Sequence, residues 1–374
     1  MKILHFIIGK ANPNRPNGVN YVIHGHCKYA ASHGHQVTVI GLSKNTRKHE
    51  IVDREGFKVS VFRNFFRGCL PEIIKSLDNV DIVHLHSVWK PYNSIVAFFC
   101  KKFNKPYVVT THSGLAEDRI KQSKYYLKKL YHFLFQKKLF DDSSGVHSIT
   151  KEEIFDNSKM TKNDNIFFVP NGIDLTKIKN DDLGRSIENP DKIKFGYLGR
   201  FAIEKNVKSL ILAISKLPSN IIEKVECQLI GPIDNDAKKL DILIKKLDLQ
   251  EQIIFTGPLY GSEKYNALRN LDFYVHPAFS DVVSIAVMEA MACGLPLVIT
   301  RTSQVAYYYD SNSFIMVEPT INEINKGIAK MIELQHTWQE MSNNAINLVN
   351  NRLSWEIVSR EMVQEYKKIL SDHR

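Results

Sequence analysis

The sequence has few cysteines and no pattern among them. Its 374 residues contain five cysteines, and no two of them form a Cys-x-x-Cys pair. An odd number of scattered cysteines is typical of reduced residues in a protein core and argues against a disulfide framework or a zinc site. We therefore expect a protein of a reducing compartment, with buried cysteines at positions 27, 69, 100, 227 and 293.

Long apolar runs are also missing. A membrane-spanning helix needs about 18 apolar residues, whereas the run from Ser94 to Cys100 is typical of this chain. The N-terminal MKILHFIIGK has a short apolar run and no small-residue cleavage site before Asn12, so it fits a buried strand better than a signal peptide. These absences predict a soluble, intracellular protein.

Several catalytic motifs do not occur. The sequence has no Walker loop, no GxGxxG, no HExxH and no GxSxG elbow, so nothing supports a P-loop enzyme, a zincin or a Ser-His-Asp hydrolase. One DxD triplet, Asp234-Asn235-Asp236, could suggest a metal-bound nucleotide-sugar site. Because it directly precedes a helical segment, we favour the interpretation that it caps free helix N–H groups.

What the chain does contain is positive charge and a globular composition. Its formal net charge is +10 and 44% of its residues are hydrophobic. The charge implies affinity for an anionic partner, which could be nucleic acid, a lipid surface or a phosphorylated ligand. The length exceeds that of one ordinary core and suggests two domains.

Strand and helix patterns alternate through the first half. The strand-like segments are residues 2–8, 34–41, 57–62, 81–86, 107–112 and 166–170. Alternation with helical segments predicts a parallel sheet with helices on both faces, and such sheets bind ligands at the carboxyl ends of their strands. Two candidate site residues fall at such ends, Gly18 in the loop 9–20 and His112.

A second α/β series follows a polar segment. Its strand-like segments are residues 192–200, 225–231, 252–257, 272–276 and 295–300. Residues 176–191 lack an apolar period and suit a linker. We therefore expect an α/β protein with a first domain at residues 1–175 and a second at residues 192–354. The amphipathic terminal helix, within residues 355–374, could cross back to brace the first domain.

The segment SDVVSIAVMEAMACGLP, residues 280–296, reads as a turn that opens into a helix. The first N–H groups of a helix can bind an anion. Asp281 and Glu289 would lie about 12 Å apart if the interval were helical, too far to share one metal ion but suitable for the two ends of an elongated ligand. In the alternative interpretation Glu289 is solvated, and the apolar residues form a core stripe of Ile285, Val287, Met288 and Met291.

Two cations occupy the loop that follows the first strand of the second series. Arg200 supplies a planar fork and Lys205 a point charge, a combination that could close on a diphosphate. Singly, each is more often a surface charge. Their position at the carboxyl end of a strand, across from a helix start, favours the phosphate role.

The segment Lys121 to Phe140 is basic and aromatic. It contains six lysines, and no acidic residue occurs between Asp118 and Asp141. A basic amphipathic helix of this kind suits an anionic membrane surface. The alternative is a helix packed on the sheet with a solvated lysine face. Its apolar stripe would be Leu127, Leu130, Tyr131 and Leu134.

These motifs together resemble a known family. An early glycine loop is followed in order by GHQVTVIG, DIVHLHS, VVTTHSG, PNGID, GRFAIEKN, LIGP, IIFTGPL and D-x7-E-A-M-A-C-G-L-P. The chain resembles the retaining GT-B glycosyltransferases of the group 1 type, often called family 4, over nearly its whole length. The resemblance implies two Rossmann-like domains facing a cleft, with a nucleotide-sugar donor held mainly by the C-terminal domain and an acceptor by the N-terminal one.

The resemblance also implies a contact for each part of the donor. Arg200 and Lys205 would hold its diphosphate, and Glu289 would accept hydrogen bonds from the ribose hydroxyls. The backbone near Leu259 would meet the base, and Gly18 would let the first loop approach the phosphates without a side chain. Backbone N–H groups at the helix start would add to the diphosphate contact, at Val283, Ser284 and Ile285.

The transferred sugar would lie near two further residues. His112 would point into the cleft beside it, and Asp281 takes the place of a glutamate that usually hydrogen-bonds it. Because aspartate is shorter by one methylene, that contact is shifted and donor identity is less defined. Ser284 stands where the family often has glycine, and residues 302–314, with tyrosines at 307–309, match the family poorly.

The implied reaction is metal-independent transfer with retention at the anomeric carbon, without a cofactor besides the donor substrate. Arg200, Lys205 and the helix start would stabilise charge on the departing diphosphate. His112 and Asp281 complete the catalytic-site residues in a positioning sense. A UDP-sugar is favoured, with a GDP-sugar second, and the transferred unit would be a hexose or an N-acetylhexosamine.

The basic helix favours a lipid-diphosphate-linked saccharide as the acceptor. This predicts a peripheral protein at the inner face of the cytoplasmic membrane, in O-antigen or capsule biosynthesis. Two enzyme alternatives keep the fold, one with a soluble acceptor and one a GT-B epimerase. A non-catalytic anion or nucleic-acid binding protein is the alternative of another class, but the basic cluster is helical and no recognised nucleic-acid motif is present.

Overall fold

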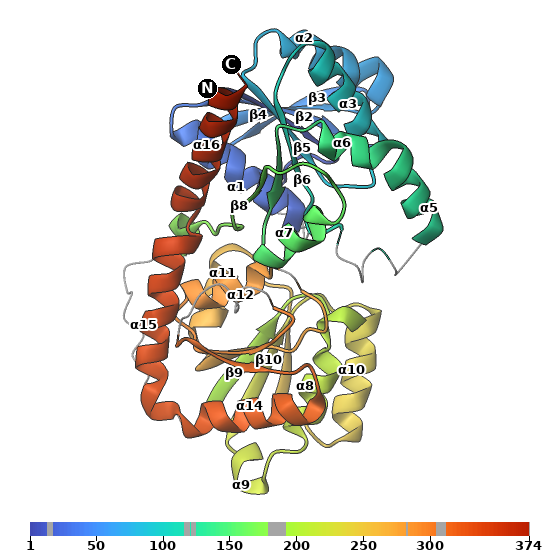
Figure 1. Cartoon of the computed structure of the whole chain (residues 1–374). Helices are drawn as coiled ribbons and strands as arrows, with labels where there is room; N and C mark the ends of the chain where they lie inside the picture. Colours follow the sequence, from blue (N-terminus) through green and yellow to red (C-terminus); the bar gives the residue numbers. More distant parts are fainter. Residues whose placement is uncertain are drawn as a thin grey trace. The chain divides into compact units, whose positions relative to one another are not determined.

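A computed structural model describes residues 1–12, 18–115, 120, 125–178, 192–281, 283–303 and 312–373. The chain divides into two compact units, one of Met1–Gly172 with Trp355–Arg374 and one of Ile173–Ser354 (Figure 1). The first unit thus ends at Gly172 rather than at residue 175. Most of the expected linker, residues 176–191, lies outside the described residues.

An eight-stranded sheet forms the centre of the first unit, in the order β3-β4-β2-β1-β5-β6-β7-β8. Neighbouring strands are parallel except β3, which pairs antiparallel with β4. The expected parallel sheet is confirmed, while β3 and β7 are additions to the expected strands. The bounds are β1 (Lys2–Ile7), β2 (Gln36–Leu42), β3 (His49–Arg54), β4 (Phe57–Phe62), β5 (Ile82–His86), β6 (Tyr107–Thr110), β7 (Gly145–Ser148) and β8 (Ile166–Phe168).

The first unit also contains helices, and the last helix of the chain is one of them. They are α1 (Gly18–Ser32), η1 (Phe65–Cys69), α2 (Leu70–Leu77), α3 (Pro91–Lys102), α5 (Tyr125–Tyr131), η2 (His132–Gln136), α6 (Lys137–Asp141), α7 (Lys151–Ser158) and α16 (Trp355–Asp372). Trp355 of α16 lies against two glycines. A Cβ at Gly25 would come within 2.1 Å of its ring, and one at Gly172 within 2.6 Å. These close approaches lock the terminal helix into the first unit.

The second unit contains a six-stranded parallel sheet in the order β11-β10-β9-β12-β13-β14. The chain leaves β9 toward β10 and β11 and then returns to β12 on the other side of β9. The strand order therefore reverses between β9 and β12. The bounds are β9 (Ile193–Leu198), β10 (Val225–Ile230), β11 (Ile253–Gly257), β12 (Phe273–His276), β13 (Leu297–Thr300) and β14 (Phe314–Val317).

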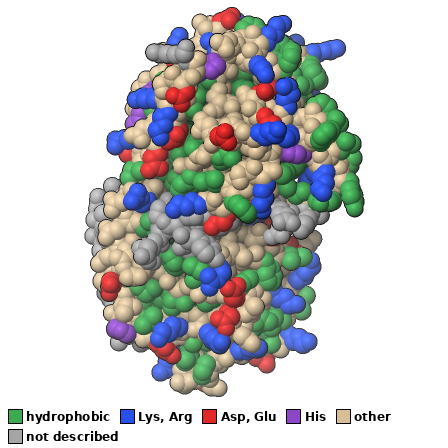
Figure 2. Space-filling view, viewed as in Figure 1, with side chains coloured by type: hydrophobic (Ala, Val, Ile, Leu, Met, Phe, Trp, Pro, Cys, Tyr) green, Lys and Arg blue, Asp and Glu red, His purple; other side chains and the backbone are tan. Residues whose placement is uncertain are grey.

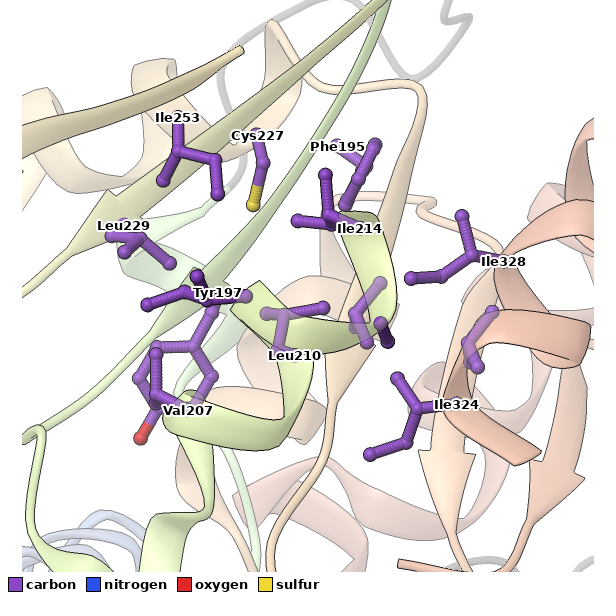
Figure 3. Close-up of a cluster of buried hydrophobic side chains, with 14 of the residues drawn as sticks. Phe195, Tyr197, Val207, Leu210, Ile214, Cys227, Leu229, Ile253, Ile324 and Ile328 are labelled. Atoms are coloured by element: carbon purple, nitrogen blue, oxygen red, sulfur yellow. The ribbon is translucent and has the colours of Figure 1, made fainter. Parts of the chain in front are cut away.

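The helices of the second unit pack on both faces of its sheet. They are η3 (Leu175–Lys177), η4 (Ile203–Lys205), α8 (Val207–Ile214), α9 (Ser219–Ile222), α10 (Asn235–Lys246), α11 (Gly261–Arg269), α12 (Ile285–Ala292), α14 (Ile321–Glu333), η5 (Gln335–Thr337), α15 (Trp338–Leu348) and η6 (Val349–Leu353). Figure 3 shows one part of the core, where Leu210 of α8 and Ile328 of α14 meet sheet residues such as Phe195. This burial of apolar side chains holds the strand ends in fixed positions.

Candidate functional site

Two loops leave the second sheet where its strand order reverses. Residues 199–206 follow β9 and residues 277–284 follow β12, and these two strands are neighbours in the sheet. Open α/β sheets bind ligands at such a point, at the carboxyl ends of the strands. The fold thus brings together the two segments in which sequence patterns predict phosphate contacts.

Hydrogen bonds tie the two loops together. The N–H of Phe279 donates to the carbonyl of Glu204 at 2.9 Å, and the side-chain amide of Asn206 donates to the carbonyl of Pro277 at 2.9 Å. Asn206 has φ 55°, a left-handed conformation that asparagine tolerates better than most residues. The loop with Arg200 and Lys205 is therefore held against the loop that leads into α12.

A largely buried carboxylate lies between these loops. Oδ2 of Asp281 is 2.6 Å from Nζ of Lys205 and 2.9 Å from Nε2 of His276. Burial by itself would raise the pKa of Asp281, but hydrogen bonds and charge interactions with His276 and Lys205 lower it well below its ordinary value. Because an ionised carboxylate only accepts hydrogen bonds, His276 carries a proton on Nε2.

A second carboxylate, Glu289, is buried on α12 and has a similar arrangement. Its Oε1 accepts a hydrogen bond from Nζ of Lys264 at 2.5 Å and one from the hydroxyl of Tyr265 at 3.4 Å. Only 5% of Glu289 is exposed, so the interpretation of this residue as solvated is wrong. The core stripe of the same helix is also present, since Val287 and Met288 are fully buried.

Both ends of α12 follow from local sequence. Ser284 is the N-cap residue, and its side chain makes no capping hydrogen bond, so it does not occupy the first free N–H groups. At the other end Gly294 has φ 74°. The N–H of Leu295 donates to Ala290 at 3.1 Å and the N–H of Gly294 to Met291 at 2.9 Å, the two bonds of a Schellman motif.

Other expected site residues of the second unit have looser surroundings. The side chain of Arg200 is 58% exposed, and its Nη2 lies 3.5 Å from Oε1 of Glu204. Leu259 is half-buried after β11 and packs on the core around α12. Val283 and Ile285 flank Ser284 at the start of α12, as expected. The roles that these residues would have toward a ligand stay predictions.

Two expectations concern helix starts. Asp234 caps α10, since its carboxylate accepts hydrogen bonds from the N–H groups of Asp236 at 3.0 Å and Ala237 at 3.1 Å, so the capping interpretation of the DxD triplet is confirmed. The placement of Gly18 in a loop is wrong. Gly18 is the first residue of α1, and a Cβ on it would meet nothing within 4 Å.

The first unit contains a histidine network that sequence patterns did not predict, and its members are buried except for the partly buried His112. His5, His84, His86, His112 and His147 come from or directly follow strands β1, β5, β6 and β7. Nδ1 of His5 is 2.9 Å from Nε2 of His86, whose Nδ1 is 3.2 Å from Nε2 of His112. The period-two repeat of histidine in DIVHLH was the available signal, because alternate residues of a strand share one face.

Burial keeps these imidazoles neutral. It lowers the pKa of His5 and of His112 from 6.5 to about 3, and the pKa of His147 to about 4. For His84 and His86, burial and the neighbouring histidines lower the pKa well below 6.5. The first sheet therefore carries buried polar imidazole groups that are uncharged at neutral pH.

Three of the imidazoles have ligand nitrogens within 4.8 Å of one another and are candidates to hold a metal ion, His5, His84 and His86. Five of their six ring nitrogens have protein partners within the described residues, the exception being Nε2 of His5. Besides the contact between His5 and His86, the two nitrogens of His84 each lie 2.5 Å from a hydroxyl, of Tyr366 and of Thr110. Hydrogen bonds thus connect the described histidines to one another and to Tyr366 and Thr110.

His112 lies in a strained turn after β6. It has φ 49° and the next residue, Ser113, has φ 56°, both left-handed. The buried carboxylate of Glu153 holds this turn, because it accepts hydrogen bonds from the hydroxyl of Thr111 and from the N–H of Ser113. Non-glycine residues in this conformation persist only where surrounding contacts impose it, and they cluster at functional sites.

The basic segment forms a helix with an exposed apolar face, described from residue 125 onward and at residue 120. None of the residues of α5 is buried. Large apolar side chains are strongly exposed along it, Tyr126, Leu127, Leu130, Phe133, Leu134 and Phe135. Figure 2 shows hydrophobic and basic side chains gathered over this part of the first unit. Leu127, Leu130 and Leu134 of the predicted stripe are thus exposed, against the alternative interpretation. The fourth residue of the stripe, Tyr131, is half-buried beside Trp89 and Ser94.

Comparisons with known proteins agree over nearly the whole chain. Two family profiles match it, Glycosyltransferase Family 4 over residues 16–177 and Glycosyl transferases group 1 over residues 179–348. An uncharacterized glycosyltransferase of Methanocaldococcus jannaschii is 25% identical over 290 residues, 74% of this chain and 71% of that protein. Protein CapJ of Staphylococcus aureus is 25% identical over 293 residues, 74% of this chain and 70% of that protein.

A solved structure shows the same architecture. HepE of Anabaena, crystallised with UDP, has a TM-score of 0.78 and 16% identity, covering 98% of this chain and 100% of that one. The expected α/β fold class with two parallel-sheet domains, GT-B, is confirmed. Within the described parts of the chain, every helix is too short or too polar to span a bilayer.

Proposed function

Because the chain belongs to the group 1 glycosyltransferases, we propose that it moves a hexose or an N-acetylhexosamine from a nucleotide sugar to a lipid-linked saccharide, with retention at the anomeric carbon. A UDP-sugar is the first candidate donor and a GDP-sugar the second. The observation that carries the donor site is the contact between Lys205 and Asp281, beside the start of α12, where the strand order reverses. A cation, a carboxylate and free helix N–H groups converge there.

In the proposed reaction an acceptor hydroxyl attacks the anomeric carbon on the face from which the diphosphate leaves. The bond from that carbon to the diphosphate oxygen breaks, the new glycosidic bond forms, and the departing phosphate oxygen takes the hydroxyl proton. Lys205, Arg200 and the N–H groups at Val283, Ser284 and Ile285 stabilise the charge that builds on the diphosphate. The exposed Arg200 is free to reorient, because its contact with Glu204 is a surface ion pair of small energy.

The other donor groups have proposed partners in the same unit. Glu289 receives the ribose hydroxyls, the backbone near Leu259 meets the base, and Asp281 receives a hydroxyl of the transferred sugar. In the first unit, His112 positions the sugar, and Gly18 at the start of α1 approaches the phosphates. No metal takes part in this scheme, so EDTA should leave the rate unchanged.

The exposed helix supports a lipid-linked acceptor. A continuous apolar face with lysines and no acidic residue before Asp141 suits insertion into an anionic membrane surface. A pocket beside it extends this face toward α3, because Phe98, Leu134 and Phe135 line it. Lys101 and Lys138 also line this pocket, and both pair with Asp142 at 3.0 Å. We place the enzyme at the inner face of the cytoplasmic membrane, in the assembly of a bacterial surface polysaccharide such as O-antigen or capsule.

A thermal-shift screen with UDP, GDP, ADP and dTDP, each alone and with its common sugars, tests the donor site. A ligand that binds only the folded state raises the melting temperature, and UDP is expected to give the largest shift. Tight binding of oligonucleotides at physiological salt, with no shift for any nucleoside diphosphate, would instead support an anion-binding protein. Transfer without liposome binding would support a soluble acceptor.

A further inference from the structure

The two carboxylates of the candidate donor site are held in the same way. Each uses one oxygen for contacts inside the protein, Oδ2 in Asp281 and Oε1 in Glu289. Among the described residues, no side chain or backbone group donates a hydrogen bond to the other oxygen of either one. Neither of these remaining oxygens is completely buried, although only 5% of Glu289 and 14% of the Asp281 side chain are exposed.

We propose that His276 and Lys264 are positioning residues, each of which holds one carboxylate by a single oxygen and leaves the other oxygen for hydroxyls of the donor. His276 does this for Asp281 and the transferred sugar, and Lys264 does it for Glu289 and the ribose. The inference rests on the proposed function, because the two ligand groups are those of a nucleotide sugar. Neither residue reacts; each acts through the carboxylate that it holds.

His276 is well placed to orient Asp281. It is the last residue of β12 and is 1% exposed, so its ring has little freedom. On the side away from Asp281, its Nδ1 lies 3.5 Å from the hydroxyl of Tyr274, which also donates to the carbonyl of Leu198 at 3.2 Å. The ring thus connects Asp281 to the rigid sheet. Such support matters for Asp281, because its side chain is shorter than the glutamate usual in the family and must hold its oxygen at a fixed position for the sugar.

Lys264 has the corresponding role on α11. Its Nζ lies 2.5 Å from Oε1 of Glu289 and 4.6 Å from the ring centre of Tyr265, whose hydroxyl contacts the same oxygen. The lysine therefore both compensates the buried charge of Glu289 and fixes the orientation of the carboxylate. Removal of the partner of a buried ion pair is strongly destabilising, because it leaves an uncompensated buried charge.

His276 and Lys264 act on different parts of one ligand, so substitution of each residue should affect ligand binding in a different way. A nucleoside diphosphate contains the ribose but lacks the transferred sugar. Loss of Lys264 should therefore weaken the nucleoside diphosphate and the nucleotide sugar equally. Loss of His276 should weaken only interactions of the intact nucleotide sugar, because the group that Asp281 would hold is missing from the nucleoside diphosphate.

The test compares His276→Leu, His276→Gln and Lys264→Met in the full chain. The glutamine amide can donate from near the position of Nε2, so it serves as the conservative variant. His336→Leu and Lys245→Met are matched controls, since both residues are exposed in the same unit and away from the site. Calorimetry gives Kd for the nucleoside diphosphate that stabilises the wild type most, and initial rates give kcat/KM for its sugar form.

For His276→Leu we expect kcat/KM to fall about 10-fold or more, with Kd for the nucleoside diphosphate within about 2-fold of wild type and with recovery in His276→Gln. Lys264→Met should weaken both ligands by a similar factor, about 10-fold. The inference is overturned if a folded His276→Leu loses nucleoside diphosphate affinity to the same extent as kcat/KM, or if His276→Gln is no better. If the wild-type protein binds no nucleoside diphosphate, the proposed function is overturned instead. That result would be seen before any variant is measured.

Discussion

Nζ of Lys205 lies 2.6 Å from Oδ2 of Asp281, although 76 positions separate the two residues in the chain. The contact joins the loop after β9 to the loop after β12, and both side chains are largely buried, at 18% and 14% exposed. Each residue therefore compensates the charge of the other. Removal of either one would leave an uncompensated charge in a site of low solvent access.

Lys205→Ala should lower kcat/KM by about an order of magnitude or more, because a cation next to the departing diphosphate is lost. The same change removes one of the two partners that keep the pKa of Asp281 low, so that pKa should rise. Purified enzyme and a nucleotide-sugar assay measure the first effect. Lys245→Ala, at an exposed ion pair on α10, is the control, and unchanged turnover of Lys205→Ala would remove the diphosphate assignment.

Gly25→Ala should destabilise the first unit, because its Cβ would fall 2.1 Å from the ring of Trp355. Overpacking of this kind costs about 1 to 3 kcal/mol, and the expected loss in urea unfolding lies at the upper end of that range. Gly18→Ala is the matched control for stability, since its Cβ would meet nothing within 4 Å. If Gly18→Ala keeps its stability but loses activity, the proposed approach of Gly18 to the phosphates gains support. Equal stability of both variants would argue against the tight contact at Trp355.

The histidine network should make the protein sensitive to acid. The pKa of His5 and of His112 is lowered from 6.5 to about 3 in the folded state, so the unfolded chain binds more protons below pH 6.5. The contribution of these neutral histidines to the free energy of unfolding is therefore fully present above pH 6.5, and it decreases as the pH falls toward about 3. For one such histidine the free energy of unfolding falls by about 1.4 kcal/mol per pH unit in that window.

Urea titrations at pH 7.5, 6 and 5, read by circular dichroism, measure this slope. The variant His147→Gln should reduce it, because the pKa of His147 is lowered by burial to about 4. His336→Gln replaces an exposed histidine of the second unit and should leave the slope unchanged. A free energy of unfolding that stays constant from pH 6.5 to 5 would contradict burial of the network in neutral form.

Replacement of Leu130 and Phe133 by Asp should abolish sedimentation with anionic liposomes at low salt. Both side chains lie on the exposed face of the basic helix, at 56% and 77% exposed. The two introduced aspartate charges would have to enter the membrane interface, which opposes insertion of the helix. The substitutions also reduce the apolar area that the helix can bury in the membrane. Phe155→Asp is the control, because Phe155 is 64% exposed but lies on α7. Wild-type protein that stays in the supernatant at low salt would contradict the membrane proposal.

Features that depend on neighbouring residues were predictable. The cap of Asp234 on α10 and the end of α12 at Gly294 require hydrogen bonds only between residues a few positions apart. Most strands of the two sheets were also predicted, because buried parallel strands are apolar runs. The antiparallel β3, His49–Arg54, was missed because it is an edge strand whose residues are all at least partly exposed.

The partners of the site residues were not predictable. His276 and Lys264 belong to no motif that the sequence patterns singled out, yet they contact Asp281 and Glu289. The histidine network likewise depends on which strands are neighbours. His5 and His84 come together because β1 pairs with β5 in that register, and no local pattern specifies that pairing.

By itself the sequence determined the two α/β units, the helix ends and the types of residue at the strand termini, because periodicity, caps and turns act over short distances along the chain. Only the tertiary structure decided that Asp281 lies between Lys205 and His276, and that Glu289 is buried against Lys264. Those contacts depend on strand order and on side-chain packing between distant segments. The physical reason is that a buried carboxylate must find a cation or hydrogen-bond donor from whichever segment the fold brings to it.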